Sequence, residues 1–197
     1  MDDQPMAPLC RRRAVLKAAL ALAPWLISPA HAQDPAKAPP QDPASAPPQP
    51  GDRLVFLTGP KKGAAIRVDD LELGGPLAQA YPADPSGVVR DGTRLNLVMV
   101  VRIGSDGLSK ETLERSADGV VAYSAVCTHQ ACPVNMWVPE LPAFVCSCHG
   151  SEYDPKNGAE VLAGPAPRPL PALPLKSENG LLTVAGGFTG RVGGETN

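Results

Sequence analysis

Cys127-Thr128-His129-Gln130-Ala131-Cys132 and a second stretch, Cys146-Ser147-Cys148-His149-Gly150-Ser151, decide how this chain is interpreted. Each stretch places two cysteines and one histidine within six residues. The chain has five Cys and three His in total, and only Cys10 and His31 lie outside the two stretches. Because thiolate and imidazole groups bind iron and zinc well, the pattern predicts that both stretches hold one metal centre.

Six candidate ligands exceed what one centre needs. A single zinc ion takes four ligands, and a [2Fe-2S] cluster of mixed ligation also takes four, two Cys on one iron and two His on the other. Separate Cys-x-x-Cys and His-x-x-x-His units favour zinc, whereas each stretch here mixes the two residue types. The mixed units therefore favour the cluster, and the two remaining cysteines are expected to form a disulfide in an oxidising compartment.

The spacing within each stretch suggests which side chains bind. In the first stretch, side chains at i and i+2 can point the same way in an extended loop. In the second, the first Cys and the His can close a tight turn around a metal, and the intervening Cys faces elsewhere. The expected ligands are Cys127 and Cys146 on one iron and His129 and His149 on the other, and the expected disulfide is Cys132–Cys148.

The two stretches resemble the boxes C-T-H-x-x-C and C-x-C-H-G-S of high-potential Rieske proteins, and their separation fits that family. The resemblance covers roughly residues 119–186 and, more weakly, residues 52–118. It implies an all-β Rieske fold, in which stacked antiparallel sheets carry a small cluster-binding subdomain, about residues 123–168, at the tip. It also implies one [2Fe-2S] cluster with the ligands and the disulfide given above.

Three further matches to the family follow the second box. Ser151 corresponds to a serine that donates a hydrogen bond to a bridging sulfide, and Tyr153 to a tyrosine that donates to a ligand cysteine sulfur. Gly164-Pro165-Ala166-Pro167 corresponds to a proline loop that covers the cluster. Because hydrogen bonds to sulfur stabilise the electron-rich reduced form, the resemblance implies a potential in the upper part of the range of about −150 to +300 mV.

Composition and periodicity independently favour an all-β domain. The chain has 43% apolar and 4% aromatic residues, with 19 Gly and 24 Pro, which suits short strands and many turns. One short helix is expected over residues 109–115, with Ser109 as its N-cap. The expected strands are Leu54–Leu57, Ala64–Val68, Leu95–Ile103, Gly119–Val126, Ala143–Cys146, Ala159–Leu162, Leu173–Lys176 and Leu181–Ala185.

The first quarter of the chain resembles an export leader and a spacer. Residues 1–32 resemble a twin-arginine signal peptide, with Arg12-Arg13 before an uncharged stretch that ends in Ala30-His31-Ala32, a small-residue cleavage site. The alternative is an uncleaved leader that acts as a tether. Residues 33–51 are rich in Pro and Ala and predict an extended linker. The Rieske domain is then expected over residues 52–190, with a tail over residues 191–197.

The chain shows no nucleotide-binding loop, second metal set or activated serine, so we expect an electron-transfer subunit rather than a stand-alone catalyst. The formal charge of −2 argues against nucleic acid as a partner. The leader and the lead-in Val121-Ala122-Tyr123-Ser124 resemble the small subunit of periplasmic arsenite-oxidase-type enzymes. The alternative is the quinol-oxidising Rieske subunit of a cytochrome bc-type complex. In both cases the partner is a larger redox subunit or a cytochrome, and the expected location is the periplasm or the periplasmic face of the inner membrane.

Overall fold

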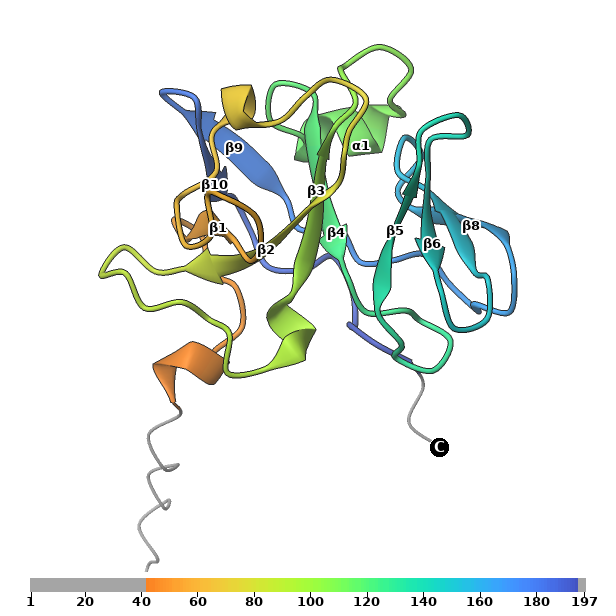
Figure 1. Ribbon diagram of the computed structural model, residues 1–197, viewed down its shortest axis with the longest axis horizontal. Helices are drawn as coiled ribbons and strands as arrows, with labels where there is room; N and C mark the ends of the chain where they lie inside the picture. The colour runs from red at the N-terminus through yellow and green to blue at the C-terminus, as the bar shows by residue number, and fades with distance from the viewer. Residues whose placement is uncertain (1–41, 195–197) are drawn as a thin grey trace, which may run out of the picture. The chain divides into compact units, whose positions relative to one another are not determined.

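The computed structural model describes residues 42–194, and within them ten strands form two antiparallel sheets (Figure 1). The larger sheet has the order β4 (Val120–Ser124), β3 (Val98–Arg102), β2 (Ala78–Ala83), β1 (Arg53–Phe56), β10 (Leu181–Val184) and β9 (Leu175–Glu178). The smaller sheet has the order β5 (Val134–Val138), β6 (Ala143–Cys146), β7 (Glu152–Asp154) and β8 (Glu160–Ala163). The expected all-β fold with stacked antiparallel sheets is confirmed.

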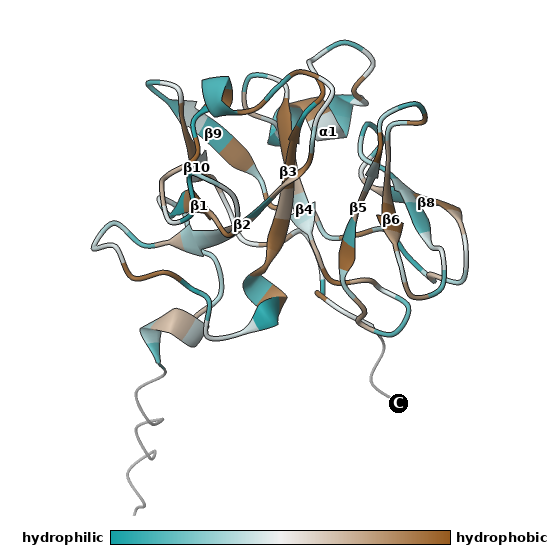
Figure 2. Cartoon of the chain, viewed as in Figure 1, coloured by the Kyte–Doolittle hydropathy of each residue, from teal (hydrophilic) through white to brown (hydrophobic). Residues whose placement is uncertain are grey.

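Strand β3 shows why the domain has two apolar cores. Its side chains alternate between the faces of the larger sheet, as the pleat of a strand requires. Val98 and Val100 belong to the core on one face, and Met99 and Val101 belong to the core that the smaller sheet covers. All four side chains are fully buried, and their apolar character gives β3 its brown colour in Figure 2.

The larger sheet curls back on itself, because its edge strand β4 also bonds to the segment that leads into β9. The amide of Ser124 donates to the carbonyl of Pro171 at 2.9 Å, and the amide of Leu173 donates to the carbonyl of Ala122 at 2.9 Å. The first core therefore lies inside the curl, with the apolar side chains of β1, β9 and β10 directed into it.

Several elements differ from the sequence-based expectation. Strand β3 starts at Val98, because residues 94–96 form a 3-10 turn in which Thr93 accepts from the amide of Leu95. Residues 64–67 form only isolated bridges, to Val55 and Leu181, and Val68 begins a 3-10 turn (Val68–Asp70) instead of ending a strand. Strands β2, β5 and β7 were not expected. The short helix is α1 (Lys110–Arg115), and the hydroxyl of its N-cap Ser109 accepts from the amide of Thr112, as the sequence predicts.

Residues 42–51, which the sequence assigns to an extended linker, are instead held on the domain. The carbonyl of Ala44 accepts from the amide of Gly92 at 3.0 Å, and the carbonyl of Ala46 accepts from the side-chain amide of Asn96 at 2.8 Å. Proline-rich backbone lacks donors but keeps its carbonyls, and the domain pairs these. The expected signal peptide and residues 33–41 of the linker lie outside the described residues. Among residues 42–194, no helix has the length and apolar character needed to cross a membrane.

Candidate metal centre

Both cysteine-histidine stretches are tight loops at one end of the smaller sheet. The first ligand loop, residues 127–132, joins β4 to β5 and is closed by the amide of Cys127 donating to the carbonyl of Cys132 at 2.8 Å. The second ligand loop, residues 146–151, joins β6 to β7 and is closed by the amide of Cys146 donating to the carbonyl of Ser151 at 2.9 Å. Because Val134 pairs with Cys146 in the β5–β6 ladder, the two loops leave the sheet side by side.

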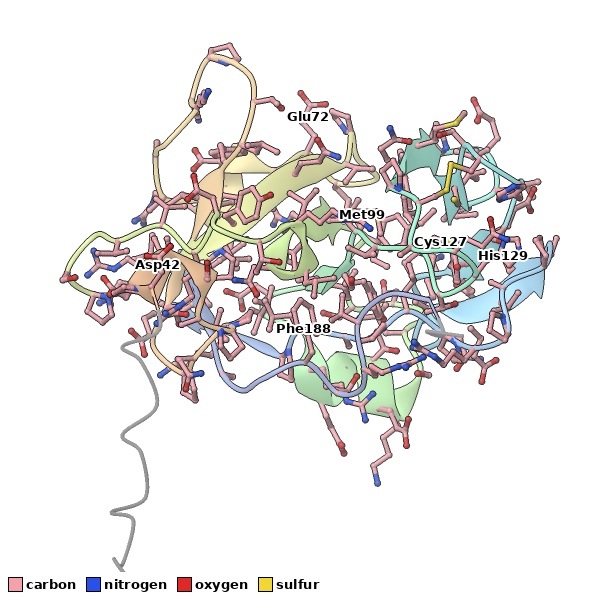
Figure 3. All side chains as sticks on the ribbon, turned by 90° about the horizontal axis from the view of Figure 1, so that it is seen from below. Asp42, Glu72, Met99, Cys127, His129 and Phe188 are labelled. Atoms are coloured by element: carbon pink, nitrogen blue, oxygen red, sulfur yellow. A yellow bond between two sulfur atoms is a disulfide. The ribbon has the colours of Figure 1, made fainter. Side chains whose placement is uncertain are left out.

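The four expected ligands divide into a buried and a more exposed pair. The side chains of Cys127 and Cys146 are both 1% exposed, and neither forms a disulfide. The rings of His129 and His149 meet edge to face with centroids 4.8 Å apart, and His149 is exposed. A centre held by these four side chains would have thiolates on its inner side and imidazoles towards the surface. Figure 3 shows Cys127 and His129 on the same loop.

The remaining two cysteines form the expected disulfide, Cys132–Cys148, which joins the two ligand loops. The sulfur atoms of Cys132, Cys146 and Cys148 all lie within 4.8 Å of one another. Since Cys132 and Cys148 are bonded to each other, Cys146 is the one member of this trio whose thiolate is available to a metal. The disulfide therefore packs beside an expected ligand and fixes the spacing of the loops.

Two buried polar atoms test whether this site fits a cluster. Nδ1 of His129 and Oγ of Ser151 are buried without a hydrogen-bond partner among the described protein atoms. Such atoms are rare in proteins because an unpaired buried polar group costs about 1–3 kcal/mol. An imidazole nitrogen that binds iron and a hydroxyl that donates to a cluster sulfide would both be satisfied. The donor set therefore fits a [2Fe-2S] cluster.

The environment of Cys146 agrees with this fit. Burial raises the pKa of the Cys146 thiol, because desolvation disfavours the thiolate. The backbone amides of Cys148 and His149 partly oppose this rise in pKa by hydrogen bonding. A thiolate at this position needs a positively charged partner, which a bound metal supplies.

Tyr153 on β7 extends the site by a hydrogen bond to sulfur. Its hydroxyl oxygen lies 3.1 Å from Sγ of Cys127 and 3.4 Å from the amide nitrogen of Thr128. Burial, reinforced by Cys127, raises the pKa of Tyr153 to about 12, so the hydroxyl keeps its proton at neutral pH. A cysteine bound to a metal has no proton to give, and the tyrosine would then be the donor.

The proline loop, residues 164–167, rests directly on the second ligand loop. A methyl group built at Gly164 would lie 2.5 Å from Cα of Ser151, and the φ of Gly164 is +87°. Both facts require glycine at this position. The structure therefore places the loop against residues 150–151, next to the expected ligand His149.

Two contributions to the site were not expected from the sequence. Thr128, between two expected ligands, is fully buried, and its hydroxyl donates to the carbonyl of Arg168 at 2.6 Å. Arg94, far from both boxes in sequence, donates to the carbonyl of Ala131. The position of Thr128 between two expected ligands could have indicated its role from the sequence alone. Nothing in the sequence around Arg94 indicates its hydrogen bond to Ala131.

The fold and the site define a cluster-binding β domain of the Rieske class, and comparison with known proteins agrees. Residues 79–174 match the family model of the Rieske [2Fe-2S] domain. The chain therefore carries a Rieske [2Fe-2S] domain, which binds one such cluster.

Relatives of this chain include a cytochrome bc1 complex Rieske iron-sulfur subunit of Streptomyces lividans. It is 38% identical over 98 residues, which are 49% of this chain and 58% of that protein. A putative respiratory nitrate reductase subunit Rieske of Haloferax mediterranei is 35% identical over 134 residues, 66% of this chain and 58% of that protein. A solved structure, a hyperthermophilic respiratory complex III, aligns with a TM-score of 0.40 and 28% identity over 59% of this chain and 70% of that chain. The matches to these two relatives thus span about three fifths of each relative's length.

Proposed function

We propose that this protein is the one-electron transfer subunit of a respiratory oxidoreductase, with its cluster held by Cys127, Cys146, His129 and His149. A bound [2Fe-2S] cluster with this ligation supplies one-electron redox chemistry at a high potential. The observation that carries the proposal is the division of the ligand set, with two cysteines 1% exposed and His149 at the surface. Electrons would therefore enter and leave on the histidine side.

The other residues of the site serve this function by position. The hydroxyls of Tyr153 and Ser151 supply hydrogen bonds to sulfur, which favour the reduced state. The disulfide Cys132–Cys148 and the proline loop hold and cover the second ligand loop. Because these groups lie on strand β7 and on short loops that adjoin the strands of the smaller sheet, the site needs little rearrangement when its charge changes.

A cytochrome bc-type complex is the first candidate assembly, with quinol as electron donor and a cytochrome as acceptor. The support is the similarity to bc1 Rieske subunits together with the disulfide and the positions of Ser151 and Tyr153. Gln130-Ala131 at the tip of the first ligand loop differs from the Leu-Gly usual in that subfamily. Quinol binding would therefore involve a more polar tip.

The second candidate is an exported small subunit of the arsenite-oxidase type, which passes electrons from a larger redox subunit to a cytochrome. The twin-arginine leader over residues 1–32 favours it, since this route exports folded proteins that already contain a cofactor. The similarity to a nitrate reductase Rieske subunit supports a role outside bc-type complexes. Both candidates place the domain in the periplasm, either free after cleavage or anchored to the inner membrane by an uncleaved leader.

Purification of the native protein tests both the presence of the cluster and the identity of the assembly. The protein as isolated is expected to contain two iron atoms and two acid-labile sulfides, with the electron paramagnetic resonance signal of a mixed-ligand cluster after reduction. A colourless protein that contains zinc would contradict electron transfer. Co-purification with a cytochrome b and quinol-dependent reduction would select the first assembly, whereas co-purification with a molybdenum-containing subunit would select the second.

A further inference from the structure

After β10 the chain turns back towards the site. We call residues 186–194 the C-terminal strap. The amide of Thr189 donates to the carbonyl of Ala172 at 2.9 Å, and its hydroxyl accepts from the amide of Ala172 at 2.9 Å. Phe188 packs against the core inside the curled sheet. In Figure 3 the segment that carries Phe188 runs towards the loop that carries Cys127 and His129.

The end of the strap lies directly on the backbone of the first ligand loop. A methyl group built at Gly194 would lie 2.7 Å from the carbonyl oxygen of His129 and 3.1 Å from the amide nitrogen of Ala131. One built at Gly193 would lie 3.7 Å from Cβ of Ala131. The strap therefore covers the outer side of this loop, and the contact at residue 194 leaves no space for a side chain.

Arg168 joins the strap to the first ligand loop, because its side chain binds the strap and its backbone carbonyl binds the loop. Its guanidinium group donates to the carbonyl of Arg191 at 2.7 Å and to the carbonyl of Gly193. Its own carbonyl accepts from the buried hydroxyl of Thr128 at 2.6 Å. The planar fork of arginine can hold two carbonyls at once, which the single ammonium of lysine does less well. Arg168 thus holds the loop directly at Thr128 and, through the strap, at residues 129–131.

We propose that Arg168 is a positioning residue for the cluster, and that it acts by clamping the C-terminal strap over the first ligand loop while anchoring Thr128. This inference rests on the ligand set proposed above, since Thr128 lies between Cys127 and His129. The clamp holds the backbone of residues 127–132 against opening. Loss of the clamp would therefore speed local opening of this loop and release of iron, with the core of the domain unchanged.

The test compares full-length Arg168→Lys and Gly194→Ala with a matched control, Arg115→Lys. Arg115 lines the same surface cavity of about 390 Å³ as Arg168, but its ion pair is with Glu111 on its own helix. Amide hydrogen exchange is measured for peptides that cover residues 127–132 and, as an internal reference, β3 and β4. Iron release to a chelator and the electron paramagnetic resonance spectrum are measured on the same loaded samples.

Arg168→Lys and Gly194→Ala are both expected to exchange faster over residues 127–132 and to release iron about tenfold faster. Loss of a residue that orients a metal ligand commonly weakens metal binding by this much or more. The resonance spectra of both variants should shift or broaden, whereas Arg115→Lys should match the wild type. If Arg168→Lys fails to fold, Gly194→Ala still tests the contact with His129, because it adds one methyl group near the end of the described chain.

Wild-type exchange and iron release in both strap variants would overturn the inference. Faster exchange that extends equally to β3 and β4 would also overturn it, because Arg168 would then only stabilise the whole domain. Wild-type protein without iron and sulfide would instead overturn the proposed function. In that case, the exchange data would still show whether the strap holds the loop.

Discussion

The hydroxyl of Tyr153 lies 3.1 Å from the sulfur of Cys127, across the interface between strand β7 and the first ligand loop. Tyr153 is fully buried, so this contact is isolated from water. The same hydroxyl lies 3.4 Å from the amide nitrogen and from the hydroxyl of Thr128. A residue that follows the second ligand loop therefore determines the surroundings of a ligand in the first.

Replacement Tyr153→Phe removes this donor and keeps the ring that fills the core. Loss of the hydrogen bond destabilises the reduced, more electron-rich cluster more than the oxidised cluster, so the midpoint potential should fall. A difference of about 1.4 kcal/mol, at the upper end of the range of a typical hydrogen bond, corresponds to roughly 60 mV for one electron. Redox titration followed by electron paramagnetic resonance measures the shift, and an unchanged potential with the cluster retained would contradict the hydrogen bond.

Replacement Ser151→Ala should lower the potential in the same direction, by a comparable tens of millivolts. The hydroxyl of Ser151 is fully buried and has no partner among the described protein atoms, so a cluster sulfide is its expected acceptor. Ser147→Ala is the matched control, because Ser147 belongs to the same loop but is exposed. Equal potentials in the Ser147 and Ser151 variants would show that the buried hydroxyl does not donate to the cluster.

Replacement Cys132→Ser breaks the bridge between the ligand loops. The bridge spans a sequence separation of 16 residues, and closing a loop of this size stabilises a fold by about 3 kcal/mol. The variant should therefore unfold at a lower temperature and lose its cluster faster. Cys148→Ser should behave alike, and the double variant should add no further loss. Additive effects of the two substitutions would contradict the disulfide.

The site was more predictable from the sequence than the strands. The expected disulfide and the closeness of the two histidines depend on the two boxes alone, because their spacing leaves few ways to gather four ligands. Strand β2 was missed because Ala, Gln and Pro are poor strand formers. Its proline is tolerated because β3 pairs only with residues 78–80, so Pro82, which has no amide hydrogen, lies beyond that ladder.

Contacts between distant segments account for what sequence reasoning missed. Leu173 was expected to begin the strand that became β9, but its amide bonds to β4 instead, and β9 starts at Leu175. The carbonyls of residues 44 and 46 find donors on residues 92 and 96, which no local pattern indicates. Residues 191–194, expected to be a tail, lie in the C-terminal strap for the same reason.

Replacement Asp52→Ala tests the ion pair that fastens residues 42–51 to the sheet. Asp52 is 1% exposed and accepts from Nε of Arg90 at 2.6 Å, from Nη2 of Arg90 at 3.0 Å and from the amide of Gln49 at 2.8 Å. Removal of one partner leaves a buried charge, which costs about 3–5 kcal/mol. Chemical denaturation should show this loss, and the double variant Asp52→Ala/Arg90→Met should recover part of it. Asp69→Ala, at an exposed position, is the control with little effect.

Replacement Ala131→Gly should stabilise the domain, unlike most alanine-to-glycine changes. Ala131 has a φ of +55°, in the left-handed region where a Cβ costs about 1–2 kcal/mol. Arg94 donates to its carbonyl, which helps to hold this conformation. Glycine removes the steric cost, but the greater conformational entropy of the unfolded chain opposes folding by about 0.4–1 kcal/mol. The free energy of unfolding should therefore rise by about 0.5–1 kcal/mol.

Ala163→Gly is the matched control for this change, because Ala163 is exposed at the end of β8 and does not have a positive φ. Glycine there should destabilise the domain by about 0.5–1 kcal/mol through chain entropy alone. Thermal unfolding of the two variants in parallel should therefore show a higher unfolding temperature for Ala131→Gly and a lower one for Ala163→Gly. If Ala131→Gly lowers the unfolding temperature as much as Ala163→Gly does, the left-handed conformation at position 131 carries no steric cost.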